Sequence, residues 1–491
     1  MKLKLTYILL LGLTAAMLSG QPYFNRIHAW GETQPELLVL DSGYVTLLQY
    51  DQNKNGLVIR EYNWLGDVVD SAYYLFEAGP NTTGYCLFSS NDNRNFISAF
   101  SIGKTVLFTK FNRQWDTVHT QTYQIDSNLT IINSLYPDSD TTFVAAGSFY
   151  NQITKRSNLY LCRLDTSLNL LWEKQYVDTT NSPFGGFFGG YVLPAGKGFM
   201  IGAGGAYASY HPNKSFIIGT DGMGNELWKK EFSTPEGVAA MRLGKRQDGN
   251  FLYVTSENLD TNFRSFQDPM VLRFGVIDTA GNILVDKQIG PIMDNLHTSA
   301  FTQTLDGHFV MGGYTYVDVG KDVSHLFKFT ENGDSIWHRL YWYGYPEGLS
   351  IMYAARATPD TGIVIAGDFL DTEDRYYRFG GPTNYTWLMK LDQYGCDTAG
   401  CEQISLPEVN LPQTRLEVYP NPFNDHVQLR WAEPQEEVNI KAYNSTGQLI
   451  DHRIFKNIQD AEITTRSWPA GIYHLKLISR GKEQALSLVK E

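Results

Sequence analysis

Four cysteines are the residues of this chain whose type and spacing point most directly to chemistry. Cys396 and Cys401 flank Asp397-Thr398-Ala399-Gly400, and in an oxidising compartment a close pair around such a turn can close a local disulfide. A zinc site would need two further Cys or His ligands at suitable spacing, and none follows nearby. We therefore predict a Cys396–Cys401 disulfide. Cys86 and Cys162 lie in apolar segments, where we expect buried, free thiols.

An oxygen-rich segment, DQNKNG at residues 51–56, opens like a calcium-binding loop, with oxygen ligands at alternate positions and a glycine for the sharp turn. The bidentate glutamate that should close the loop is missing, because Tyr62 holds its place and Glu61 lies one residue early. A polar hairpin turn explains the same residues. We assign no metal site here.

Local catalytic signatures are absent from the sequence: there is no HExxH, no GxSxG and no P-loop, and the 10 histidines are scattered. Two carboxylates from distant loops can still form a glycosidase site without any local pattern. Since the chain has 52 acidic residues, no catalytic pair can be singled out. The sequence favours a non-catalytic protein over an enzyme, and we expect no cofactor.

The elements that must position any site are strands. Apolar runs are short and end at Gly, Pro, Asn or Asp, and sustained helical spacing is almost absent. One marker, a turn followed by an aromatic-led or apolar strand, recurs at Tyr44, Tyr85, Phe143, Phe199, Phe251, Phe309 and Ile363. A second, an apolar strand that runs into a polar turn, follows each one at Asn63, Asn112, Asp165, Asp221, Asp278, Thr330 and Asp392.

A repeat of about 50 residues with short strands and Gly/Asp/Asn turns is typical of a four-stranded propeller blade. We predict an all-β chain with a seven-bladed β-propeller, with six or eight blades as the alternatives. Ring closure requires the segment before the first marker, Phe24 to Trp30, to pair with the blade that contains Trp387 to Leu391. Trp172, Trp228 and Trp337 share one register after the polar turn and are predicted to fill the wedge between neighbouring blades.

Charge and composition exclude some functions. The formal net charge of −12 would repel nucleic acid.

Aromatic side chains in residues 341–345 and 183–188 could stack on sugar rings, although packing between blades explains them as well.

The N-terminus has the pattern of a secretory signal peptide. Lys2 and Lys4 precede an apolar run from Leu5 to Leu18, which is too short for a stable membrane anchor, and small residues follow before Gln21. We expect cleavage after about Gly20. No later run has the length of a transmembrane helix, so we expect no transmembrane anchor.

The C-terminal segment carries three spaced motifs: LEVYPNPFNDHVQL, VNIKAYNSTGQLI and WPAGIYHLKLISRGKEQALSLVKE. The two prolines of the first exclude a helix. The alternating apolar residues and the turn at Gly447 predict a small β-sandwich. The motif residues to which we attach importance are Tyr419, Pro420, Asn421, Pro422, Gly447, Gly471, Tyr473 and Lys490.

In this order, the motifs resemble the type A C-terminal sorting domain of proteins exported by the bacterial type IX secretion system. The resemblance covers residues 416–491 and implies that the type IX machinery is a partner. It also implies an immunoglobulin-like sandwich, export across the outer membrane, removal of the domain, and attachment of the mature protein to surface lipopolysaccharide.

Together these patterns predict a signal peptide (1–20), a propeller (21–405), a protease-sensitive linker (406–415) and the sorting domain (416–491). The protein is expected to be secreted or attached to the outer-membrane surface. We expect a non-catalytic binding module with a surface glycan or protein as its ligand. The alternative is an exported enzyme that degrades polysaccharide or peptide with acidic residues in the central funnel.

Overall fold

The chain is described here from a computed structural model, which divides into two compact units, Met1–Ile404 and Ser405–Glu491. The structure describes residues 23–30, 32–50, 56–75, 82–89, 95–102, 105–124, 129–151, 156–177, 187–205, 214–233, 241–259, 269–294, 296–318, 321–343, 348–371, 384–398, 416–420, 423–444, 449–479 and 482–490. The predicted signal peptide, the predicted linker and Cys401 lie outside these residues.

Within these ranges the chain forms strands and no helix, which confirms the all-β prediction. The first three four-stranded antiparallel sheets follow the chain order. Sheet I contains β2 (Glu32–Leu40), β3 (Gly43–Tyr50), β4 (Gly56–Asn63) and β5 (Val68–Leu75). Sheet II contains β6 (Thr82–Ser89), β7 (Phe96–Ile102), β8 (Thr105–Phe111) and β9 (Thr117–Gln124). Sheet III contains β10 (Leu129–Ser139), β11 (Thr142–Asn151), β12 (Arg156–Asp165) and β13 (Leu170–Tyr176).

The next three sheets repeat this order. Sheet IV contains β14 (Phe187–Ala195), β15 (Gly198–Gly205), β16 (Lys214–Thr220) and β17 (Glu226–Ser233). Sheet V contains β18 (Arg242–Lys245), β19 (Phe251–Asn258), β20 (Pro269–Ile277) and β21 (Ile283–Asp294). Sheet VI contains β22 (His297–Gln303), β23 (Phe309–Asp318), β24 (Lys321–Phe329) and β25 (Ser335–Tyr341).

Sheet VII joins the two ends of the first unit. It contains β26 (Gly348–Ala357), β27 (Ile363–Asp371), β28 (Asn384–Leu391) and, paired with β28, β1 (Phe24–Trp30). The pairing is antiparallel, with Ile27 opposite Trp387. This confirms the predicted closure, in which the first strand completes the last sheet.

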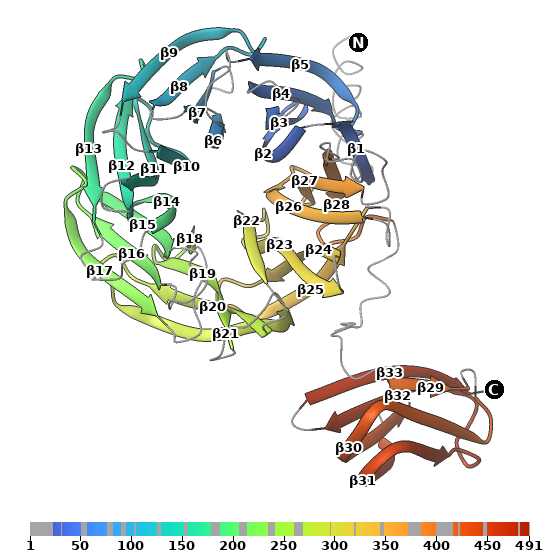
Figure 1. Cartoon of the computed structure of the whole chain (residues 1–491). Coiled ribbons are helices and arrows are strands. Elements are labelled where there is room, and N and C mark those ends of the chain that lie inside the picture. Colours follow the sequence, from blue (N-terminus) through green and yellow to red (C-terminus); the bar gives the residue numbers. More distant parts are fainter. Residues whose placement is uncertain are drawn as a thin grey trace, which may run out of the picture. The chain divides into compact units, whose positions relative to one another are not determined.

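The sheets are arranged in a ring, as Figure 1 shows, with the first strand of each sheet nearest the centre and the last strand outermost. Each apolar cluster of this unit lies between two neighbouring sheets; one, for example, joins Val144 and Leu161 of sheet III to Phe199 and Ile218 of sheet IV. The outermost strand β9 is mostly exposed, whereas β19 is buried along its whole length. This is the architecture of a β-propeller.

The repeated polar turns connect the third and fourth strands of sheets I to VI, and the turn at Asp392 follows the third strand of sheet VII. They explain the second sequence marker. At Asp278, the carboxylate accepts hydrogen bonds from the backbone N–H groups of Ala280 (2.9 Å) and Asn282 (2.8 Å). The fourth residue of the turn, Gly281, has φ +84°, a left-handed conformation that glycine adopts without steric cost. Trp115 and Leu168 occupy the equivalent place at φ 63° and 64°, so the turn chemistry dominates over side-chain preference.

The first marker is correct in six sheets and wrong in sheet II. Tyr85 lies on the innermost strand β6, and Phe96, at the start of β7, holds the position expected for Tyr85. Both segments combine a polar residue with an aromatic-led apolar run, so local pattern alone does not distinguish the two strands.

The three tryptophans pack between neighbouring sheets, as predicted. The indole of Trp228, on β17, lies so close to Gly281 of sheet V that an added Cβ there would come within 2.6 Å of it. Its Nε1 donates a hydrogen bond to the Thr279 carbonyl at 2.9 Å. Trp172 and Trp337 approach Gly224 and Gly395 of the following sheets in the same way.

Tyrosines near the ends of outermost strands make a second link between sheets. The hydroxyls of Tyr123, Tyr176 and Tyr341 donate hydrogen bonds to carbonyls in the polar turn of the next sheet, at 2.5, 2.7 and 2.7 Å. Tyr74 makes the equivalent bond to Trp115. Each bond satisfies a carbonyl at the left-handed position of a turn.

We expect Tyr176→Phe to lower the free energy of unfolding by about 1 to 2 kcal/mol, because it leaves the buried Gly224 carbonyl without its donor. Urea unfolding of the full chain measures this. Tyr136→Phe is the matched control, since Tyr136 is 38% exposed. Equal effects of the two substitutions would contradict a role for the Tyr176 link.

Three histidines, of which His325 is buried and His28 and His338 are half-buried, make the ring sensitive to acid. Burial, with Arg60 and Arg26 adding to it, lowers the pKa of His28 to about 4. Burial lowers the pKa of His338 to about 4, and burial together with His338 lowers that of His325 to about 3. The unfolded chain binds these protons near pH 6.5, so the stabilisation is complete above that pH and is lost as the pH falls toward 4.

Each such histidine is expected to contribute a slope of about 1.4 kcal/mol per pH unit between these limits. Urea midpoints at several values between pH 7 and pH 5 should therefore fall with pH, and His338→Gln should reduce the slope. The exposed His119→Gln is the control. A slope that His338→Gln leaves unchanged would show that His338 does not contribute.

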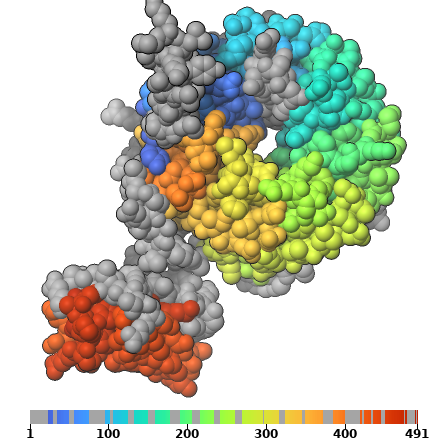
Figure 2. All heavy atoms as spheres, turned by 180° about the vertical axis from the view of Figure 1, so that it is seen from behind, coloured from blue at the N-terminus to red at the C-terminus, as the bar shows by residue number. Residues whose placement is uncertain are grey.

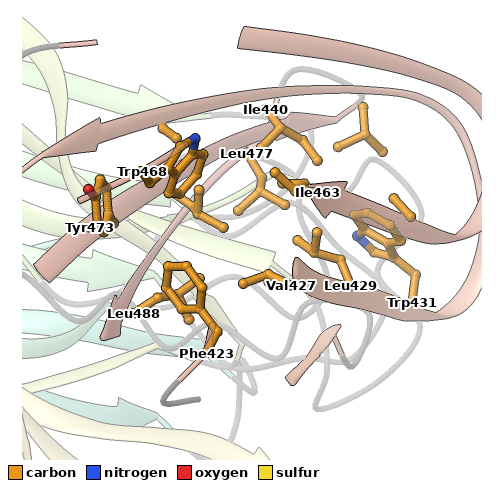
Figure 3. Packing of buried hydrophobic residues seen from close by; sticks show 14 residues of the cluster. Phe423, Val427, Leu429, Trp431, Ile440, Ile463, Trp468, Tyr473, Leu477 and Leu488 are labelled. Carbon is orange, nitrogen blue, oxygen red and sulfur yellow. The ribbon is translucent and has the colours of Figure 1, made fainter. Parts of the chain in front are cut away.

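The second unit is a five-stranded sheet system. Its strands are β29 (Leu416–Tyr419), β30 (His426–Asn444), β31 (Leu449–Thr464), β32 (Gly471–Ser479) and β33 (Lys482–Lys490). The first part of β30 pairs with β29 and its last part with β32, while β31 pairs with both parts. One apolar core, which includes Phe423, Trp431, Trp468 and Leu488, fills this unit, as Figure 3 shows.

Candidate functional site

The predicted sorting motif lies at three places in the second unit. Tyr419 ends β29 and is 38% exposed, and Pro420 follows it through a cis peptide bond. Gly471 begins β32 and pairs with Lys490 at the end of β33. Tyr473 is buried. Asn421, Pro422 and Gly447 lie outside the described residues.

The ring of Phe423 lies in the core of this unit together with Tyr473 and Trp468 (Figure 3). Its centroid lies 6.1 Å from that of Tyr473 and 6.0 Å from that of Trp468. The ammonium of Lys490 lies 5.7 Å from the same centroid, and a parallel bridge joins Phe423 to Lys490. Phe423, Tyr473 of the Gly-Ile-Tyr motif and Lys490 at the end of β33 therefore form one packed cluster.

Lys490 is buried and hydrogen-bonded. It is 9% exposed, and its Nζ donates a hydrogen bond to the Asn424 carbonyl. The hydroxyl of Thr465 donates to the same carbonyl at 2.9 Å. The sequence pattern marks Lys490 and Tyr473, but it does not mark Phe423 as their common partner, because that contact depends on strand pairing.

A second candidate site lies at the centre of the ring, which is open in the view of Figure 2. We call Glu36, Tyr191, Arg242, Thr298 and Arg356 the ring-centre cluster. They lie on the innermost strands β2, β14, β18, β22 and β26.

β-bulges help to place this cluster. The register of β2 shifts between Thr33 and Glu36, that of β14 between Phe188 and Tyr191, and that of β22 between Thr298 and Ala300. A bulge bends its strand and changes the direction of nearby side chains.

The contacts of the cluster are ionic and aromatic. Arg356 Nη2 lies 3.8 Å from Glu36 Oε2. The guanidinium carbon of Arg242 lies 3.7 Å from the ring centroid of Tyr191, and its Nη2 donates a long bond to the Thr298 carbonyl, 3.4 Å. Arg242 Nε and Thr298 Oγ1 are buried and have no hydrogen-bond partner among the described residues.

The charges of the cluster influence one another across the ring. Burial lowers the pKa of Arg242 to about 9, while Glu36 raises it and Arg356 lowers it. Burial raises the pKa of Glu36, and Arg356 and Arg242 oppose that shift. The side chain of Glu36 is 32% exposed, so part of it is accessible to solvent.

With two guanidinium groups and one carboxylate, this arrangement can bind an anion. A glycoside hydrolase needs two carboxyl groups about 5 to 10 Å apart. Glu36 instead faces Arg356 and Arg242. The cluster carries one more positive than negative charge. Since no local motif links these residues, the sequence offered no signal for them.

The other sequence-level candidates have mixed outcomes. Cys162 is a buried free thiol as predicted, and burial raises its pKa to about 12. Cys396 is fully buried, but Cys401 lies outside the described residues, so their bridge stays a prediction. The side chain of Cys86 also lies outside the described part.

The calcium-like turn at residues 51–55 lies outside the described residues. Glu61 is occupied elsewhere, because both of its oxygens accept hydrogen bonds from Arg113, at 2.6 and 2.7 Å. In the described part of the chain, no group of three or more His, Cys, Asp or Glu side chains could hold a metal ion.

Of the aromatic segments, Tyr341 is buried and Tyr343 packs on Phe369, whereas Trp342 is 44% exposed. Packing therefore explains two of these rings. The side chains of residues 183–188 are not described.

A propeller-bearing, all-β protein is the class that this fold defines. Residues 417–491 match the family described as the secretion system C-terminal sorting domain, which confirms the resemblance to the type IX sorting domain. The chain therefore carries an export address and is a secreted or cell-surface protein. No helix in the described part of the chain is long and apolar enough to cross a membrane.

No curated protein matches the chain. Among solved structures, a Bacteroides caccae protein of unknown function is 14% identical, with 59% of this chain and 87% of that chain covered and a TM-score of 0.33. The alpha-L-arabinanase of Penicillium chrysogenum, complexed with arabinobiose, is 10% identical, with coverages of 64% and 94% and a TM-score of 0.41. A Dyadobacter fermentans protein of unknown function is 9% identical, with coverages of 76% and 97% and a TM-score of 0.40. The TM-scores of these three structures are below 0.5, so the similarities do not bear on the activity of this chain.

Proposed function

We propose that this protein is exported through the type IX secretion system and that its propeller, residues 21–405, is a non-catalytic binding module. The proposal includes a cleaved signal peptide (1–20), a linker (406–415), seven blades, and an immunoglobulin-like sandwich as the sorting domain. It also includes a Cys396–Cys401 disulfide and attachment at the outer-membrane surface.

Two features support the export part of the proposal. The sorting-domain match covers residues 417–491, within one residue of the predicted start. Tyr473 and Lys490 pack against Phe423, which follows the proline motif in the sequence, and the matched segment has its own apolar core. The seven four-stranded sheets found in the described residues support a seven-bladed ring.

One observation carries the binding role. At the ring centre, the carboxylate of Glu36 lies next to arginine rather than a second carboxylate, with Arg356 Nη2 at 3.8 Å. This favours recognition of a polar ligand, such as a surface glycan or a protein segment, over acid-base hydrolysis. The other function we consider is an exported enzyme that degrades polysaccharide or peptide at the ring centre.

A glycan array run beside a reducing-end release assay separates the two functions. We expect the purified 21–405 fragment to bind without releasing reducing ends. Release of reducing ends from a polysaccharide, lost on Glu36→Gln, would contradict the binding module and favour the enzyme.

A further inference from the structure

We infer that the ring-centre cluster binds a carboxylate group of its ligand and that Arg242 is the residue that recognises it. This inference rests on the binding role proposed above and adds the chemistry of the ligand.

The first support is a buried charge with an unused hydrogen-bond donor. Arg242 is 8% exposed, and its Nε has no hydrogen-bond partner among the described residues. Glu36 is the carboxylate of the cluster, and Arg356 already lies 3.8 Å from it. Burying a charge without a dedicated ionic partner costs free energy. A monoanion that pairs with Arg242 is therefore expected to bind here.

The second support is the geometry of the guanidinium. The ring of Tyr191 lies 3.7 Å from the guanidinium carbon of Arg242 and covers it. Stacking occupies a face of the group, whereas hydrogen bonds form at its edge. A carboxylate accepts two parallel N–H bonds from such an edge. The bond from Nη2 to the Thr298 carbonyl, 3.4 Å long, is weak enough for a ligand to replace it.

The third support is the polar surroundings. Thr298 Oγ1 on β22 is a buried atom without a hydrogen-bond partner among the described residues, and the carbonyl of the same residue accepts the bond from Arg242. Such an atom can satisfy a hydroxyl or amide group of a ligand. A single negative charge fits the excess of one positive charge, while a dianionic phosphate would meet a stronger repulsion from Glu36 than a carboxylate does.

Titration calorimetry of the purified full chain tests this with three probes: D-galacturonate, N-acetylglycine and D-galactose. The first two carry a carboxylate on a sugar and on a peptide-like group, and galactose is the neutral counterpart of galacturonate. We expect at least one carboxylate probe to bind about tenfold or more tightly than galactose. Preference for one of the two assigns the source of the carboxylate, and equal binding assigns the carboxylate alone.

Variants connect the preference to the cluster. Arg242→Met keeps the apolar stem over Tyr191 and should abolish the preference for the carboxylate probes. Arg273→Met is the matched control, because Arg273 pairs with Asp286 at 2.6 Å and its loss removes the same charge elsewhere in the ring. Glu36→Gln should strengthen carboxylate binding several-fold, an effect that a purely structural role would not produce. It also keeps the test decisive if Arg242→Met does not fold.

The inference is overturned if galactose binds as well as galacturonate and N-acetylglycine, or if neither carboxylate binds. It is also overturned if Glu36→Gln weakens carboxylate binding, or if Arg273→Met removes the preference as Arg242→Met does. Neutral glycans bound on the array would then leave the binding function standing. Release of reducing ends would overturn that function instead, whichever probe binds.

Discussion

Deletion of residues 21–31 is expected to destabilise the whole ring. The deletion removes β1, which is the antiparallel partner of β28 in sheet VII. It leaves β28 as an open edge and breaks the hydrogen bond from Trp387 Nε1 to Asn25 Oδ1, 2.6 Å long. A ring depends on its closure, because an open edge exposes unpaired backbone groups.

Phe24 shows most clearly why the deletion should destabilise the ring. Its side chain is 7% exposed and belongs to the apolar cluster that joins Leu37 and Tyr44 of sheet I to Ala366 and Leu388 of sheet VII. The ring of Phe24 lies 5.9 Å from that of Tyr44. Phe24→Ala alone should lower the free energy of unfolding by about 3 to 5 kcal/mol, and the deletion by more.

Urea unfolding followed by tryptophan fluorescence measures both changes. Val118→Ala is the control, because Val118 lies on the outermost strand β9 and is 54% exposed. An unfolding midpoint that stays unchanged after the deletion would contradict the closure, although the individual sheets would stand.

The second large effect is expected on export. Removal of Leu488–Glu491 takes away Leu488, which is 3% exposed in the core of the second unit, and the bridge from Lys490 to Phe423. The propeller belongs to a separate compact unit and should still fold. The truncated protein should therefore accumulate, folded, in the periplasm.

Cell fractionation with immunodetection measures this outcome. Phe423→Ala should give a partial export defect, because Phe423 packs against Trp468 and Tyr473. Ile454→Ala is the matched control, since Ile454 is 53% exposed on β31. Normal levels of the truncated protein at the surface or in the medium would show that the terminal strand is not part of the address.

Much of the ring could be predicted from sequence, because its repeats are encoded locally. The turn that begins at Asp278 is formed by its carboxylate and by Gly281 three residues later. Both residues can be recognised in the sequence. The pairing of Phe24–Trp30 with β28 follows from the need to close a ring. The one misplaced marker is Tyr85. The sequence pattern did not place it correctly, because two adjacent strands of the same sheet have similar sequences.

The site residues could not be predicted in this way. Glu36, Arg242 and Arg356 come from three sheets and meet only because their strands are innermost. In the same way, Phe423 gains its role from a parallel bridge with Lys490, far along the chain. Contacts that depend on tertiary closure leave no spacing pattern in the sequence.

The C-terminal segment is expected to act as an export address independently of the propeller. A reporter protein preceded by residues 1–20 and followed by residues 406–491 tests it most directly in a bacterium with a type IX system. We expect the reporter to reach the surface or the medium, and we expect removal of its last four residues to leave it in the periplasm. A reporter that stays in the periplasm, while the full chain is exported by the same cells, would show that the segment is not a sufficient address.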